Sequence, residues 1–365
     1  MDWPNDVRAV QGAAVADPSK LDAFMGKMAG DMGAAMSASL VVLGDRLGLY
    51  RALADAGPST SAGLAAKAGV NERNLREWLS AQAAAGYVDY DAATSTFSLN
   101  EEQTMVFADE GGPAFMAGGF ELIGAMFIDE PNISAAFKTG SGLGWHEHCP
   151  CLFRGTERFF RPGYNANLVS AWIPALDGVE EQLKGGVAVA DVGCGHGAST
   201  LLMAKAYPKS RFTGFDYHTP SIERARELAR EEGLDGRVTF ETASAKDFPG
   251  DGYGLVTIFD ALHDMGDPVG AARHIRQALA PDGVFMLVEP NAADDLSGNL
   301  NPFGRMFYAA STMVCTPASM SQEVGLALGA QAGEARLKRV AEEAGFTRFR
   351  RASETLTNMV LELRP

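Results

Sequence analysis

Three closely spaced glycines predict a nucleotide-binding loop. The segment "VADVGCGHGAST" carries Gly193, Gly195 and Gly197 directly after an apolar run. Glycine at such positions lets the backbone turn sharply and approach a ligand that a Cβ atom would obstruct. Asp216 closes the next apolar run, where a carboxylate can accept hydrogen bonds from ribose hydroxyls. Because the loop also fits the dinucleotide pattern G-x-G-x-x-A, it indicates a nucleotide without identifying which one.

A histidine with an acidic neighbour could move a proton. His263 and Asp264 lie in "FDALHDMGDP", at the end of the fourth apolar run of this half of the chain. An imidazole with a pKa near neutrality suits removal of a proton from a phenol, a carboxylic acid or a protonated amine. The alternative, that His263 only caps a strand end or packs beside a ligand, stays open.

The stretch "GWHEHCPCLF" contains good zinc ligands in an unfavourable arrangement. His146, His148, Cys149 and Cys151 fall within six positions, so they can hardly surround one tetrahedral ion without a distant partner such as Cys315. The sequence has no second paired Cys/His cluster. We therefore interpret the stretch as a pocket wall and predict no metal site. A structural zinc, or a soft metalloid bound by the three cysteines, is the alternative.

The elements that must position these residues alternate between strand and helix after Gly186. Such alternation is typical of a parallel α/β sheet, in which ligands bind at the carboxyl ends of the strands. We predict strands at 187–192, 211–216, 237–242, 253–260 and 284–290, with helices at 219–234 and 268–283. A helix at 336–346 and two strands at 346–352 and 355–365 complete the domain.

The N-terminal part predicts a mostly helical winged-helix domain. Residues 20–36 suggest a packing helix, 64–88 a helix-turn-helix, and 86–99 two short strands that form the wing. A break at 57–60 precedes the second of these, with Ser61 as the candidate N-cap. Residues 37–107 hold five Lys/Arg against eight Asp/Glu. DNA binding needs cationic contacts to phosphate, so we favour dimerisation or cavity scaffolding.

Length, charge and cysteine content argue against several classes of protein. The 365 residues are enough for two domains, and the net charge of −15 disfavours general binding to nucleic acid or anionic membranes. The four cysteines are too few for a disulfide framework. Neither a signal peptide nor an apolar run long enough to span a membrane is recognised, so we expect a cytoplasmic protein with no membrane partner.

Several motifs together resemble class I S-adenosylmethionine-dependent methyltransferases. The glycine loop, "ASAKDF" at 243–248 and the final helix with its strand pair carry the resemblance through nearly all of 187–365. It implies a Rossmann-like seven-stranded sheet whose last strand is antiparallel. With the winged helix, the chain resembles small-molecule O-methyltransferases, in which a His-Asp-Trp histidine is the general base. Met265 replaces that Trp here. Across almost the whole chain it is also similar to bacterial winged-helix methyltransferases of unknown substrate, which implies a homodimer formed through the N-terminal domain.

The resemblance supplies candidate residues and boundaries. S-adenosylmethionine is the implied cofactor, with these candidate contacts: Asp191, Gly193, Gly195, Gly197, Asp216, Tyr217, Ala245, Asp247, Phe248 and Asp260. His263 and Asp264 are the catalytic candidates. The acceptor cavity would be lined by Trp145, His146, His148, Phe159, Tyr164, Phe303, Arg305, Tyr308 and Met313. We predict a dimerisation domain at 1–107, a linker and cavity region at 108–185, and a methyltransferase domain at 186–365 with a cap insertion at 291–333.

The expected function is methyl transfer to a small molecule, with oxygen as the expected acceptor atom. Two alternatives remain: a cofactor-sensing winged-helix transcription regulator, and transfer to sulfur or a metalloid through Cys149, Cys151 and Cys315.

Overall fold

A computed structural model describes residues 16–365 of the chain. The N-terminal decapeptide, on which the signal-peptide expectation rests, lies outside the described residues. The chain divides into two compact units, the first ending at Thr104 and the second running from Met105 to Pro365. The three-part division predicted from the sequence stays a prediction.

The first unit is a winged helix preceded by a long helix. Its elements are α1 (Pro18–Arg46), α2 (Leu49–Ala56), α3 (Ser61–Ala68), α4 (Glu72–Ala84), and the antiparallel wing strands β1 (Asp89–Asp91) and β2 (Thr96–Ser98). The helix predicted at 20–36 is part of the longer α1. Thr60, not Ser61, caps α3: its hydroxyl accepts a hydrogen bond from the Gly63 N–H, while the Ser61 hydroxyl donates to Glu72.

The second helix of the helix-turn-helix carries paired charges. In α4, Arg73 forms an ion pair with Glu77 and Arg76 with Glu72, each one turn away. These guanidinium groups therefore already have carboxylate partners within the unit. Among the described residues no single helix is long and apolar enough to cross a membrane. Helices α1 and α2, which meet at a bend of 69°, would be so together, by length and composition alone.

A seven-stranded sheet organises the second unit. The strand order is β5-β4-β3-β6-β7-β9-β8, and β9 runs antiparallel to both of its neighbours. The bounds are β3 (Ala188–Val192), β4 (Arg211–Asp216), β5 (Val238–Thr242), β6 (Tyr253–Phe259), β7 (Leu279–Pro290), β8 (Arg348–Glu354) and β9 (Asn358–Arg364). The predicted Rossmann-like sheet with an antiparallel last strand is confirmed.

One predicted helix end was wrong. The helix expected at 268–283 ends at Ala278, and β7 begins at Leu279 instead of residue 284. Pro281 explains the difference, because its ring would clash with the preceding turn of a continued helix. The pairing of β6 with β7 shifts register between Tyr253 and Leu255, next to this early strand start.

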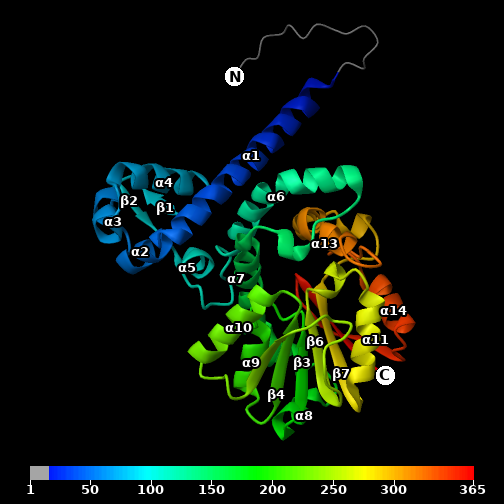
Figure 1. Cartoon of the computed structure of the whole chain (residues 1–365). Coiled ribbons are helices and arrows are strands. Elements are labelled where there is room, and N and C mark those ends of the chain that lie inside the picture. The colour runs from blue at the N-terminus through cyan, green and yellow to red at the C-terminus, as the bar shows by residue number, and fades with distance from the viewer. Residues whose placement is uncertain (1–15) are drawn as a thin grey trace. The chain divides into compact units, whose positions relative to one another are not determined.

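Alternating strand residues supply the two cores that fix the helices on either side. Val189 and Leu255 point into one core, whereas Ala190 and Val256 point into the other. Helices α9 (Ala198–Ala206) and α10 (Thr219–Glu231) cover the first face, and α11 (Pro268–Ala278) and α14 (Glu334–Glu343) the second, as Figure 1 shows. Short α8 (Val179–Gly185) joins the first layer.

The remaining helices precede β3 or lie between later strands. They are α5 (Glu101–Phe107, which spans the unit boundary), α6 (Gly119–Thr139), η1 (Trp145–Glu147), α7 (Pro150–Asn167), η2 (Leu168–Trp172), η3 (Leu262–Asp264), η4 (Ser297–Asn299), α12 (Pro302–Ala310), η5 (Ser311–Cys315) and α13 (Thr316–Met320). A third apolar cluster connects α6, α7, α12 and η5 through Ala125, Leu152, Phe307 and Val314. The predicted insertion 291–333 therefore packs against the helices that precede the sheet.

Candidate active site

A cavity of about 910 Å³ lies within the second unit. Its walls come from the loops after β3, β4, β5 and β6 and from α6, α7, α12 and η5. The carboxyl ends of parallel strands meet at one edge of a sheet, which is where open α/β sheets place ligands. Thirteen of the predicted site residues lie on this cavity: Trp145, His146, Phe159, Tyr164, Gly193, Gly195, Asp216, Tyr217, Ala245, Asp260, His263, Asp264 and Arg305.

The glycine loop turns from β3 into α9 as predicted. Gly193, Gly195 and Gly197 all have positive φ, which favours glycine. A Cβ atom on Gly195 would meet nothing within 4 Å, so the backbone there faces open space. A Cβ atom on Gly197 would come within 2.5 Å of the Phe240 ring. Gly197 therefore allows the helix to pack on the sheet, and it does not line the cavity.

Two aspartates hold this loop in different ways. Asp191 is buried, and its carboxylate accepts hydrogen bonds from the hydroxyls of Ser199, Thr200 and Thr257, so it fastens α9 to the sheet and does not line the cavity. Asp216 does line the cavity, with one carboxylate oxygen 3.0 Å from the Gly195 N–H. Burial raises the pKa of both carboxyls.

The segment after β5 contributes one predicted residue, Ala245, and three that were not predicted. Phe248 is buried in the core against Phe215, and Asp247 is exposed outside the cavity. The cavity wall here is formed by Ala243, Ser244, Ala245 and Lys246. The turn after the strand brings this earlier part of "ASAKDF" to the cavity, so Asp247 and Phe248 do not line it and their cofactor contact stays a prediction.

His263 lies at the carboxyl edge of the sheet and is held by a carboxylate. It belongs to η3, directly after β6, and is 3% exposed. Its Nδ1 lies 2.5 Å from Oε2 of Glu289 on β7, while Oε1 of Glu289 accepts from the Leu262 N–H. Burial alone would lower the pKa of His263, but the carboxylates of Glu289 and Asp264 raise it well above its ordinary value.

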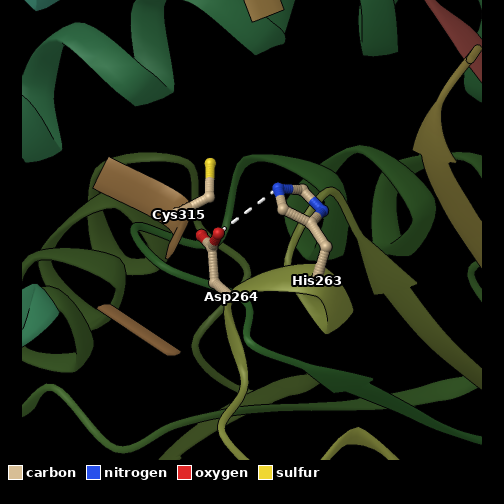
Figure 2. A group of neighbouring side chains, drawn as sticks. All are labelled: His263, Asp264 and Cys315. Carbon is tan, nitrogen blue, oxygen red and sulfur yellow. Dashed lines mark ion pairs between the residues drawn. The ribbon is translucent and has the colours of Figure 1, made fainter. Parts of the chain in front are cut away.

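Asp264 and Cys315 meet His263 on the other side of the ring. Oδ1 of Asp264 lies 3.3 Å from Nε2 of His263, and Cys315 reaches the same point from the end of η5 (Figure 2). Burial, followed by the charge of Asp264, raises the pKa of the Cys315 thiol to about 12. Burial also raises the pKa of Asp264.

The strand end before His263 has a constrained backbone. Asp260 has φ 49°, a left-handed conformation that is costly for a residue with a side chain. Its carboxylate accepts a hydrogen bond from Asn358 of β9 at 2.7 Å. Asn358 of β9 and Glu289 of β7 therefore fix the turn that carries His263 into the cavity.

The histidine–cysteine stretch at 144–153 only partly lines the cavity. Trp145 and His146 line the cavity, but His148 does not: it is buried, and its Nδ1 lies 2.8 Å from Asp129 of α6. Cys149 and Cys151 form a disulfide at the start of α7. The metalloid alternative requires both residues as free thiolates, so it would need this disulfide to be reduced.

Helical phase explains why other predicted acceptor residues do not line the cavity. On α12 the cavity face carries Pro302, Arg305, Met306 and Ala309, so Phe303 and Tyr308 fall on other faces. Phe303 is 40% exposed. Met313 packs in the apolar cluster of α6, α7 and η5 and does not line the cavity.

Sequence reasoning missed several polar residues of the site, three of which form pairs between side chains. Glu289 ends the fifth strand of the alternation, and its position beside Pro290 at a carboxyl strand end was the available signal. Glu157 and His196 both line the cavity, with Oε2 of Glu157 3.0 Å from Nδ1 of His196. This contact joins α7 to the glycine loop, and no local pattern in the sequence indicates it.

Comparison with known proteins identifies the domains. Residues 183–345 match the family model described as a methyltransferase domain, and residues 35–108 match the Rv2258c-like winged HTH domain. Residues 183–345 form a methyltransferase domain. The chain is 32% identical over 107 residues to 27-O-demethylrifamycin SV methyltransferase of Amycolatopsis mediterranei, covering 29% of this chain and 39% of that protein.

Two similarities extend over more of the chain. Mitomycin biosynthesis 6-O-methyltransferase of Streptomyces lavendulae is 24% identical over 242 residues, which are 64% of this chain and 68% of that protein. The crystal structure of human N-acetylserotonin methyltransferase with S-adenosylmethionine superposes with a TM-score of 0.70 at 15% identity, covering 96% and 99% of the two chains. The chain spans 37% to 49% of the length of the first curated relatives that it matches.

S-adenosylmethionine is the cofactor of this methyltransferase domain, and the residues at the sheet edge fit it. The open space beside Gly195 admits a ligand close to the backbone. Asp216 brings a carboxylate to the same wall, and Tyr217 and Ala245 continue it. A small number of polar groups in a mostly apolar cavity is the arrangement that fixes the orientation of such a ligand.

Proposed function

We propose that the chain transfers a methyl group to an oxygen atom of a small-molecule acceptor, with His263 as the general base. The observation that carries this proposal is the position of His263. It lies on the same cavity as the glycine loop, and its other ring nitrogen is held by Glu289 at 2.5 Å.

Glu289 prepares His263 for proton transfer. With its Nδ1–H donated to that carboxylate, a neutral imidazole presents the lone pair of Nε2 on its other side. The raised pKa of His263 makes it a stronger proton acceptor, and Glu289 stabilises the imidazolium that results. The cofactor, when bound, supplies a methyl group that its sulfonium already activates. The remaining task of the chain is to align the acceptor with that methyl group.

The cavity wall supports an apolar, aromatic class of acceptor. Between the glycine loop and the cap it is lined by Phe120, Ile123, Phe153, Phe159, Phe160, Met306 and Phe307. Aromatic and thioether side chains favour a flat, apolar ligand. Arg305, His146 and Glu157 provide the few polar contacts that would orient a hydroxyl-bearing ring.

The test is transfer from methyl-labelled S-adenosylmethionine to a panel of phenols and hydroxylated bicyclic aromatics, followed by mass spectrometry. We expect label in an ether or ester oxygen of at least one aromatic acceptor. Label found only on nitrogen or sulfur would contradict the proposed acceptor atom. Cofactor binding without transfer to any member of the panel or of a metabolite extract would contradict the proposed activity.

We also propose that two copies of the chain associate through the first unit. Helix α1 exposes an apolar stripe at helical spacing: Leu21, Phe24, Met25, Met28, Met32 and Met36. An exposed apolar stripe of this kind marks an interaction surface. Sedimentation should give a dimer for the full chain and a monomer for Phe24→Glu combined with Met32→Glu. A monomeric parent chain would contradict the proposal. The cytoplasmic location and the absence of a nucleic-acid partner stay predictions.

A further inference from the structure

Three different metal-ligating side chains converge in the cavity beside the proposed base. One ligand atom each of His263, Asp264 and Cys315 lies within 4.8 Å of the other two. Figure 2 shows the imidazole facing the Asp264 carboxylate, with the thiol of Cys315 beside them. His263 and Cys315 are buried, and Asp264 is partly buried. All three residues line the cavity.

The Asp264 carboxylate is poorly satisfied where it lies. Its Oδ1 atom is buried and has no hydrogen-bond partner among residues 16–365, although Nε2 of His263 is 3.3 Å away. A buried polar atom without a partner costs free energy, and a cation placed against it would offset that cost. Glu289 adds a second buried carboxylate behind the imidazole, so the surroundings of the cluster favour positive charge.

The support around the cluster matches that of a metal site. Histidine ligands generally donate their second ring N–H to a carboxylate, and His263 does so through Nδ1 to Glu289. Cys315 ends the π-helical turn η5, a kind of irregularity that occurs frequently at functional sites. Ligands of tetrahedral zinc lie roughly 3.3–3.8 Å apart, so only small side-chain movements are needed to close the set.

We propose that Nε2 of His263, Oδ1 of Asp264 and Sγ of Cys315 bind one divalent cation of the zinc type. The set of one nitrogen, one oxygen and one sulfur donor suits zinc and cobalt and disfavours magnesium and calcium. Three protein ligands leave a fourth position toward the cavity. This site goes beyond the proposed function. Because the metal and the acceptor proton would use the same lone pair of Nε2, a loaded chain has no free base.

Cobalt is the informative probe, because its visible spectrum reports geometry and its near-ultraviolet charge-transfer band reports a thiolate ligand. We would titrate the full chain with Co²⁺ without cofactor or acceptor, and then displace the cobalt with Zn²⁺. One equivalent should give a tetrahedral spectrum with a thiolate band that zinc abolishes. No methyl-transfer assay is involved, so failure here is distinct from failure of the proposed function.

Two variants and one control assign the ligands. Cys315→Ser should remove the thiolate band, and Glu289→Gln should weaken metal affinity about 10- to 100-fold while keeping the band. Cys194→Ser is the matched control, because Cys194 is the other buried free cysteine of the described chain but belongs to no such cluster. Circular dichroism checks that each variant is folded. A thiolate band that persists in Cys315→Ser, or no saturable binding by the folded parent chain, would overturn the proposal.

Discussion

Two buried histidine–carboxylate pairs in the second unit have nearly the same local chemistry. His263 is 3% exposed, with Nδ1 2.5 Å from Glu289, and His148 is 4% exposed, with Nδ1 2.8 Å from Asp129. Only His263 lines the cavity. Nε2 of His148 has no hydrogen-bond partner within residues 16–365 and is buried among packed helices.

The difference between the pairs lies in the elements that carry them. His263 follows β6 at the carboxyl edge of the sheet, beside the glycine loop. His148 follows η1, and its partner Asp129 belongs to α6 and also accepts from the Cys149 N–H. The Asp129 carboxylate thus fastens the start of α7 to α6. The His263–Glu289 pair is a candidate base because it lies at the sheet edge beside the cavity. The His148–Asp129 pair lies between α6 and α7 and connects these helices.

The largest expected effect separates the two histidines in turnover. His263→Ala should lower kcat about 10²- to 10⁴-fold, the usual range for loss of a general base. His148→Ala should leave kcat per folded molecule within about threefold, since His148 lies outside the cavity. Active-site titration with cofactor corrects both values for the folded fraction. Equal losses in the two variants would remove the distinction between the pairs.

A smaller effect is expected from the carboxylate partners. Glu289→Gln keeps the shape of the side chain but removes the charge that orients His263 and stabilises its protonated form, so kcat should fall roughly 10- to 10²-fold. Asp129→Asn should leave kcat unchanged. A kcat for Glu289→Gln equal to that of the parent chain would mean that the dyad does not assist proton transfer.

The free energy of unfolding should depend more on the His148–Asp129 pair than on the His263–Glu289 pair, the reverse of the order for kcat. His148→Ala leaves the buried Asp129 carboxylate without its side-chain partner, which should lower the free energy of unfolding by about 1–3 kcal/mol. Denaturant titration of the second unit's transition measures this loss. His263→Gln, which keeps a side chain against Glu289, should cost less. The comparison fails if His263→Gln is the more destabilising change.

Sequence patterns sufficed for the sheet and for the ligand side of the cavity. Strand–helix alternation places Gly195, Asp216 and His263 at strand ends, and parallel strands necessarily bring those ends together. The same argument covers Glu289, which also lies at the carboxyl end of a parallel strand, β7. Regular backbone geometry therefore carried most of this information.

The acceptor side depends on packing between distant segments. Whether Phe303 or Met306 faces the cavity is decided by the rotation of α12, which its contacts with α6 and α7 determine. His146 and His148 were assigned together to the acceptor cavity, yet only His146 lines it, and His148 contacts Asp129 instead. Such outcomes depend on tertiary contacts that no local spacing encodes.

A third pair gives the smallest and most pH-dependent effect. Oε2 of Glu157 on α7 lies 3.0 Å from Nδ1 of His196 in the glycine loop. Burial raises the pKa of Glu157, but the hydrogen bond and charge of His196, aided by Arg161, outweigh burial and leave it below the ordinary value of 4.5. A carboxyl whose pKa is lower in the folded chain stabilises the fold above its unfolded pKa, and this contribution is lost as the pH falls through the folded pKa.

Glu157→Gln should therefore lower the free energy of unfolding by less than about 1 kcal/mol above pH 4.5, because the pair is only partly shielded from solvent. The difference from the parent chain should shrink as the pH falls below that value. A double-mutant cycle with His196→Gln, measured by denaturant titration at several pH values, isolates the pair. A coupling energy that kept growing as the pH fell below 4.5 would have the wrong sign for a carboxylate held by His196, and a coupling energy independent of pH would show that the loop is fastened to α7 by packing alone.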